Sequence, residues 1–194
     1  MSLLRAFIAL EIPSPYQDAI HRQTAGLRQA ADSSVVRWVP PGNLHITLKF
    51  LGDVSSSNVQ FLTQMLTQEA AKHPAFSFHI SGLGSFPSPR RARVIWVGIQ
   101  APAELEALQK GVESAAARLG YETEERPFSP HLTIGRVKQN ITSNEQQCIR
   151  AALEAAHVGQ IGKVDVNSIH LMKSELLPTG SVYTRLFSAP LATA

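Results

Sequence analysis

The chain contains the same tetrad twice, as His45-Ile46-Thr47-Leu48 and again as His131-Leu132-Thr133-Ile134. In each copy a histidine and a threonine lie two residues apart and alternate with apolar residues. Alternate side chains of a β-strand point to opposite faces of its sheet. Each tetrad therefore predicts a strand with an apolar core face and a polar face on which an imidazole lies beside a hydroxyl.

Strict alternation extends both faces beyond the tetrads. It places Phe50 on the apolar face of the first strand and Lys49 on the polar face with His45. In the second strand it places Arg136 opposite His131. Gly135 could reverse this placement, because glycine permits a β-bulge that turns the next side chain to the other face.

Helical periodicity and turn-forming residues set the tetrads within a series of elements. The predicted strands cover residues 3–12, 35–39, 44–51, 76–83 and 93–99, a segment starting at 131, and a hairpin of 163–173 with 182–188. The predicted helices cover residues 15–30, 57–72, 104–119 and 143–157. Strands in short groups between helices favour an α+β fold over an alternating parallel sheet. Because each tetrad strand lies between two helices, we expect two related halves, with the ligand in a cleft between two lobes.

The composition is that of a folded globular protein, with 194 residues of which 44% are hydrophobic and 17% charged. Lys and Arg exceed Asp and Glu by 18 − 15 = 3, so the surface suits an anionic ligand but the excess is too small to establish nucleic-acid binding. The densest basic run, residues 90–93, could contact phosphates, although a solvated loop is the simpler interpretation.

Cys148 is the single cysteine, which excludes an internal disulfide and favours a reducing compartment. We expect it to pack within the helix at 143–157. No segment approaches the roughly 20 apolar residues that a membrane helix needs. We therefore expect a cytoplasmic protein that has no membrane partner.

Two imidazoles facing one cleft suit in-line displacement at a phosphorus atom. The neutral histidine takes a proton from the attacking water, and the protonated one gives a proton to the leaving oxygen. The hydroxyls of Thr47 and Thr133 can donate to the phosphate oxygens as negative charge develops. This chemistry requires neither a metal nor a cofactor.

The alternatives are a structural role for the histidines and a metal site. One histidine on a strand is more often structural, but two copies with the same polar partner are hard to explain as separate packing solutions. The chain has no Asp, Glu or Cys at ligand spacing from either tetrad, and threonine is a poor zinc ligand. It also lacks a phosphate-binding glycine loop and a nucleophile elbow.

Four segments in order resemble the two-histidine phosphoesterases, and within them the RNA 2′,3′-cyclic phosphodiesterases, also called 2′-5′ RNA ligases. The segments are residues 5–10, 39–52, 93–98 and 126–136. The resemblance implies an α+β fold in which residues 1–194 form a single bilobal domain. Its two pseudo-symmetric lobes are mainly antiparallel sheet with helices packed outside and the active-site groove between them. One half of the pseudo-repeat carries His45-Thr47 and the other His131-Thr133.

The resemblance also implies a reaction and a role for each site residue. An RNA 2′,3′-cyclic phosphate would be hydrolysed to a 2′-phosphomonoester, with His45 as the proton donor and His131 as the proton acceptor. Thr47 and Thr133 would hold the phosphate, and Arg136 would position the phosphate or the water. The symmetry of the two tetrads leaves the choice of acid and base open on residue chemistry alone.

Other expectations concern the ligand. Phe128, between two prolines next to the second tetrad, could stack on a nucleobase or pack in the core. The expected partners are RNA with 2′,3′-cyclic phosphate ends or small nucleotides, bound by a monomer. The alternatives to an RNA hydrolase are a cyclic phosphodiesterase for small nucleotides and a non-catalytic module that binds RNA ends.

Overall fold

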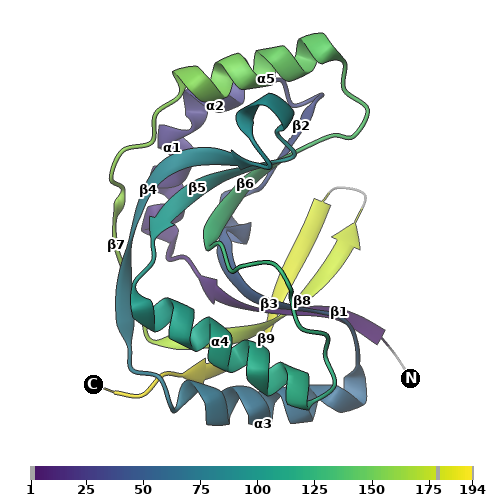
Figure 1. The fold of residues 1–194 in the computed structure, drawn as a ribbon, viewed down its shortest axis with the longest axis vertical. Helices are drawn as coiled ribbons and strands as arrows, with labels where there is room; N and C mark the ends of the chain where they lie inside the picture. The colour runs from purple at the N-terminus through teal and green to yellow at the C-terminus, as the bar shows by residue number, and fades with distance from the viewer. Residues whose placement is uncertain (1–2, 178–179, 194) are drawn as a thin grey trace.

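Two antiparallel sheets form the framework of the computed structural model, which describes residues 3–177 and 180–193 (Figure 1). The four-stranded sheet has the order β3-β1-β8-β9, with bounds His45–Ser55, Leu3–Glu11, Ser168–Leu177 and Gly180–Pro190. The five-stranded sheet has the order β2-β6-β5-β4-β7, with bounds Val36–Trp38, His131–Val137, Val94–Gln100, Phe76–Phe86 and Gly162–Val166. Each tetrad begins a strand, and the two strands belong to different sheets.

The helices lie outside the sheets. Helices α3 (Val59–Ala70) and α4 (Ala103–Arg118) pack against the four-stranded sheet. Helices α1 (Ser14–Gln23), α2 (Ala25–Ala30) and α5 (Ser143–Ala155) lie with the five-stranded sheet (Figure 1). Three 3-10 turns complete the described elements: η1 (Pro41–Asn43), η2 (Ser56–Asn58) and η3 (Pro89–Arg91). The predicted two-lobed α+β fold with helices outside is confirmed.

The chain passes between the lobes several times. Strands β1 and β3 are neighbours in one sheet, yet β2, which lies between them in sequence, belongs to the other. Similarly, β7 and β8 are separated only by Asn167 and lie in different sheets. Neither lobe is therefore built from one continuous half of the sequence.

One apolar core joins both lobes. Ile8 and Ile46 of the four-stranded sheet and Ile95 and Leu132 of the five-stranded sheet are fully buried in the same cluster. A second, small cluster on the opposite face of β1 consists of Phe7, Ala9 and Met172, with Tyr183 packed against it. This small cluster lies beneath the first tetrad.

Several predicted elements differ from the structure. The helix predicted at 15–30 is two helices, separated at Thr24, whose hydroxyl donates to the Ile20 carbonyl at 2.8 Å. Such side-chain bonds compete with the helical pattern. The strand predicted at 163–173 is divided into β7 and β8, and the first tetrad strand continues to Ser55. The turn predicted at 178–180 lies partly outside the described residues.

Cys148 is exposed, so its predicted packing is wrong. The buried stripe of α5 consists of Ile149, Ala152 and Leu153, and Cys148 lies outside it. In the part of the chain that the structure describes, no helix combines the length and the hydropathy needed to cross a lipid bilayer.

Candidate active site

The two tetrad histidines begin strands β3 and β6 and are held in the same way. His45 Nδ1 is 2.7 Å from the Asn43 carbonyl oxygen, and His131 Nδ1 is 2.7 Å from the Ser129 carbonyl oxygen. A carbonyl oxygen only accepts, so Nδ1 carries the proton in both rings. This bond fixes the ring orientation and leaves Nε2 free for chemistry.

Both tetrads also contain a β-bulge at the same position. In β3, Thr47 is paired with Ala9 and Lys49 with Ile8, so Leu48 is the extra residue. In β6, Thr133 is paired with Trp96 and Gly135 with Ile95, so Ile134 is the extra residue. A bulge of this kind reverses the alternation of side chains that follow it. We call the faces that carry His45 and Thr47, and His131 and Thr133, the site faces.

The first bulge overturns the predicted faces of two residues. Phe50, predicted in the core, is 67% exposed and is paired with Phe7 on the site face. Lys49, predicted beside His45, is only 5% exposed on the core side. The bulge at Leu48 is the physical reason for both differences.

The second bulge brings Arg136 to the site. Ile134 and Gly135 are both buried, and Arg136 is exposed on the same face as His131 and Thr133. This is the rearrangement that Gly135 was predicted to permit. The placement is reinforced by electrostatics, because the positive charge of Arg136 lowers the pKa of both His45 and His131.

Burial is the largest influence on both imidazoles and lowers the pKa of each from its ordinary value of about 6.5. The hydrogen bonds to the two carbonyls oppose this effect, and Arg136 adds to it. His131 also lowers the pKa of His45, so the two site faces are close enough to interact. The structure thus brings His45, His131 and Arg136 into one electrostatic environment.

Glu11 makes the two histidines unequal. It is paired with His45 across β1 and β3, and its negative charge raises the pKa of His45. Glu11 Oε2 is 3.3 Å from Arg185 Nη1 and 3.9 Å from His170 Nε2. No carboxylate in the described part of the chain has a corresponding effect on His131. Glu11 was not among the site residues predicted from the sequence, although it lies in the predicted first strand on the same alternation as Phe7.

Aromatic rings support each imidazole. Phe7 lies 4.8 Å from His45 between ring centroids, and Tyr183 meets His45 edge-on at 5.1 Å. Phe86 meets His131 edge-on at 4.9 Å. Phe128, by contrast, is half-buried and packs against the main core. The aromatic side chain most exposed beside the first tetrad is Phe50, which strict alternation predicts on the core face.

Lys49 connects the first tetrad strand to the segment that precedes the second tetrad strand. Its Nζ donates to Glu113 Oε1 at 2.5 Å and to the Glu122 carbonyl. Glu113 Oε1 also accepts from the Glu124 backbone amide at 2.9 Å. These bonds tie α4 and the segment that leads to His131 to the bulged strand.

The last residue of the predicted basic run at 90–93 makes hydrogen bonds within the fold. Arg93 Nη1 donates to the carbonyls of Lys138 and Gln139, at 3.1 and 3.3 Å, and η3 lies against α5. Within residues 3–177 and 180–193, no three His, Cys, Asp or Glu side chains are grouped as metal ligands would be.

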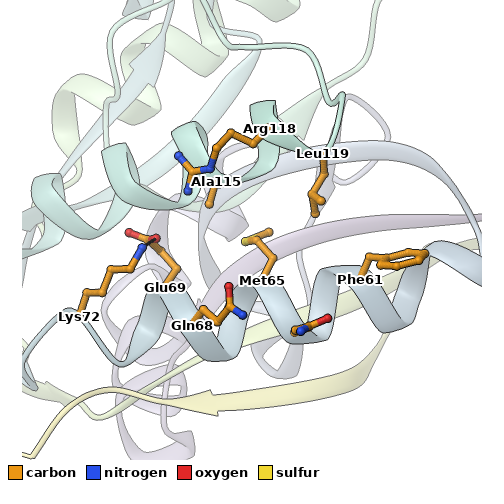
Figure 2. Close-up of a pocket in the computed structure, with 9 residues that line it drawn as sticks. Phe61, Met65, Gln68, Glu69, Lys72, Ala115, Arg118 and Leu119 are labelled. Carbon is orange, nitrogen blue, oxygen red and sulfur yellow. Dashed lines mark hydrogen bonds and ion pairs between the residues drawn. The ribbon is translucent and has the colours of Figure 1, made fainter.

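A separate hollow lies between α3 and α4 (Figure 2). Its wall includes Phe61, Met65 and Glu69 of α3, Lys72 just beyond the end of α3, and Arg118 of α4. It contains none of the tetrad residues, so we assign it no part in the site.

Comparisons with known proteins place the chain among relatives of known name and fold. A relative from Methanothermobacter thermautotrophicus, named RNA 2′,3′-cyclic phosphodiesterase, is 33% identical over 181 residues, which cover 93% of this chain and 95% of the relative. A relative of the same name from Aquifex aeolicus is 30% identical over 187 residues, covering 95% of each. The crystal structure of Escherichia coli LigT complexed with 3′-AMP has a TM-score of 0.78 and 26% identity, covering 98% of this chain and 99% of LigT.

The fold likeness extends to a crystal structure from Thermus thermophilus, with a TM-score of 0.80, 24% identity, and coverage of 98% of this chain and 99% of that one. The family model described as the 2′-5′ RNA ligase superfamily matches residues 16–176. The family that the four segments resemble is therefore confirmed: this chain belongs to the 2′-5′ RNA ligase superfamily.

Proposed function

We propose that the protein hydrolyses the 2′,3′-cyclic phosphate at the end of an RNA to a 2′-phosphomonoester, by acid–base catalysis between His45 and His131. The observation that carries the proposal is the matched tethering of the two imidazoles, which frees both Nε2 atoms on site faces that interact. The names of the relatives, RNA 2′,3′-cyclic phosphodiesterase, support the substrate. The bound 3′-AMP in LigT supports a nucleotide site.

The reaction is an in-line displacement at phosphorus. Water attacks opposite the bridging 3′ oxygen while His131 Nε2 takes a proton from it. The P–O3′ bond breaks, and His45 Nε2 gives its proton to the departing oxygen. Thr47, Thr133 and Arg136 stabilise the negative charge that develops on the non-bridging oxygens.

Glu11 supports the choice of His45 as the acid. A general acid must hold its proton before the reaction, and burial and the positive charge of Arg136 oppose this at His45. Glu11 is the carboxylate that offsets part of this effect at His45, whose pKa is still lowered by burial. His131, which lacks such a carboxylate among the described residues, suits the role of the base.

The same site could also join RNA ends. If the 5′-hydroxyl of a second RNA replaced water as the nucleophile, the same displacement would form a 2′-5′ linkage without ATP. Water is far more abundant, so we expect hydrolysis to dominate. We also expect a cytoplasmic monomer, as predicted from the sequence.

The test is product analysis. An oligoribonucleotide with a 2′,3′-cyclic phosphate end is incubated with the protein in EDTA and ¹⁸O-labelled water. We expect a 2′-phosphate that carries one ¹⁸O, identified by phosphorus NMR and mass spectrometry. A 3′-phosphate product would contradict the proposed geometry, and salt-sensitive binding without any product would indicate a module that only binds RNA ends.

A further inference from the structure

Arg37 of β2 and Arg136 of β6 are directly opposite each other in the antiparallel pair of these strands. The adjacent pair in the register is Val36 with Val137, and both of these side chains are buried on the core face. Residues that are paired across strands share a face, and alternate residues change face. Arg37 is therefore exposed on the site face next to Arg136.

Two cations in this arrangement repel each other, because like charges directly opposite on neighbouring strands are destabilising. In the described part of the chain, no carboxylate lies within ion-pair distance of either arginine. Among the described residues, no carboxylate therefore relieves the repulsion within the Arg37–Arg136 pair.

The position of the pair relates it to the reacting phosphate. Arg136 is close enough to lower the pKa of both catalytic histidines, whereas Arg37 lies one strand further out, about 5 Å away at the backbone. Strand β2 is the edge of the five-stranded sheet, so nothing in that sheet covers Arg37 on the outer side (Figure 1). An anion held between both guanidinium groups would lie next to the reacting phosphate and outside it.

We propose that Arg37 and Arg136 form a second phosphate subsite, which binds the phosphodiester linking the terminal nucleotide of the RNA to the preceding one. This inference rests on the proposed function and adds that the enzyme recognises an RNA chain and not only a cyclic mononucleotide. Guanidinium groups suit this role because they bind phosphate oxygens with two parallel hydrogen bonds. Contacts of this kind position a strand without reading its sequence.

The experiment compares Arg37→Gln with wild type on two substrates: a mononucleotide 2′,3′-cyclic phosphate and a dinucleotide that ends in one. We expect kcat/KM to fall about tenfold on the dinucleotide and to stay within about twofold on the mononucleotide. The salt dependence of dinucleotide binding should also weaken by about one ion. Arg118→Gln, at an exposed arginine on the wall of the α3–α4 hollow (Figure 2), is the matched control and should change neither substrate.

A third substrate tests the contact itself. The third substrate is a dinucleotide whose internal linkage is an uncharged methylphosphonate. On it, the kcat/KM of wild type should fall by about the same factor as the kcat/KM of Arg37→Gln falls on the normal dinucleotide. Arg37→Gln should lose nothing further. The subsite would be overturned if the substitution and the methylphosphonate reduced kcat/KM additively. It would also be overturned if Arg37→Gln reduced kcat/KM equally on the mononucleotide and the dinucleotide, or on neither.

Measuring binding of Arg37→Gln and wild type separates the subsite proposal from the proposed hydrolysis. The affinity for a 2′-phosphorylated dinucleotide needs no turnover, so it reports on the subsite even if no hydrolysis occurs. A weaker affinity in Arg37→Gln but not in Arg118→Gln would support the subsite. Unchanged affinity would mean that Arg37 only protects the sheet edge from pairing with other chains.

Discussion

Leu48 of β3 and Ile134 of β6 are equivalent: each is the fourth residue of its tetrad and the extra residue of a β-bulge. As a result, the residue five positions after each histidine returns to the site face. That residue is Phe50 in one lobe and Arg136 in the other. The two lobes thus use the same backbone device to present an aromatic ring from one side and a cation from the other.

Phe50→Ala tests the aromatic side of this arrangement. An exposed ring beside the tetrad can stack on the terminal base, and such stacking contributes about 1–3 kcal/mol per base. We therefore expect kcat/KM for a cyclic-phosphate dinucleotide to fall about tenfold, with little change in the melting temperature. Phe61→Ala, at a phenylalanine 58% exposed on α3, is the control and should leave kcat/KM unchanged. Equal effects of the two substitutions on kcat/KM would show that Phe50 does not contact the substrate.

The pH dependence of kcat/KM should be bell-shaped. Activity rises as His131 loses its proton and falls as His45 loses its own. The pKa of each is lowered from about 6.5, so we expect the maximum below that pH in the free enzyme. A rate that increases without a maximum would contradict paired acid and base roles.

Glu11→Gln separates the two limbs of that profile. Removing this carboxylate lowers the pKa of His45, so its proton is lost at a lower pH and the alkaline limb moves down. The acidic limb, set by His131, should stay in place. A shift of the acidic limb alone would show that His45 is the base, which reverses the proposed roles.

Arg136→Gln should shift both limbs in the opposite direction. Its charge lowers the pKa of both histidines, so its removal raises both values and the whole profile moves to higher pH. The maximal rate should fall as well, because a group that stabilises the transition state is lost. A lower rate on an unshifted profile would place Arg136 away from the imidazoles.

Lys49→Met probes the link between the tetrads. Removing one partner of a buried ion pair leaves the other uncompensated, which typically costs about 3–5 kcal/mol in the free energy of unfolding. Lys72→Met is the control, because Lys72 also pairs with a glutamate but its side chain is 58% exposed, so a cost below about 1 kcal/mol is expected. Denaturant unfolding of both variants measures the difference, and equal midpoints would show that the Lys49 contacts add little stability.

The sequence was sufficient for the family, the α+β architecture and the two His-Thr pairs, because these depend on strand alternation and on motif order. It was insufficient wherever the chain departs from regular alternation. Strict alternation predicts the wrong faces for Phe50 and Lys49, because the bulge at Leu48 has no signal in the sequence. The bulge before Arg136 could be anticipated, because Gly135 is a residue that permits one. Arg37 and Glu11 could not be found because their relation to the tetrads depends on strand pairing across the fold.

We expect His45 and His131 to act together in cleaving the cyclic phosphate. The most direct measurement is the turnover of an oligoribonucleotide with a 2′,3′-cyclic phosphate end, in EDTA, by wild type, His45→Ala and His131→Ala. We expect each substitution to reduce kcat at least about 100-fold while circular dichroism shows an intact fold. Turnover by either variant at the wild-type rate would show that the two histidines do not act as a catalytic pair.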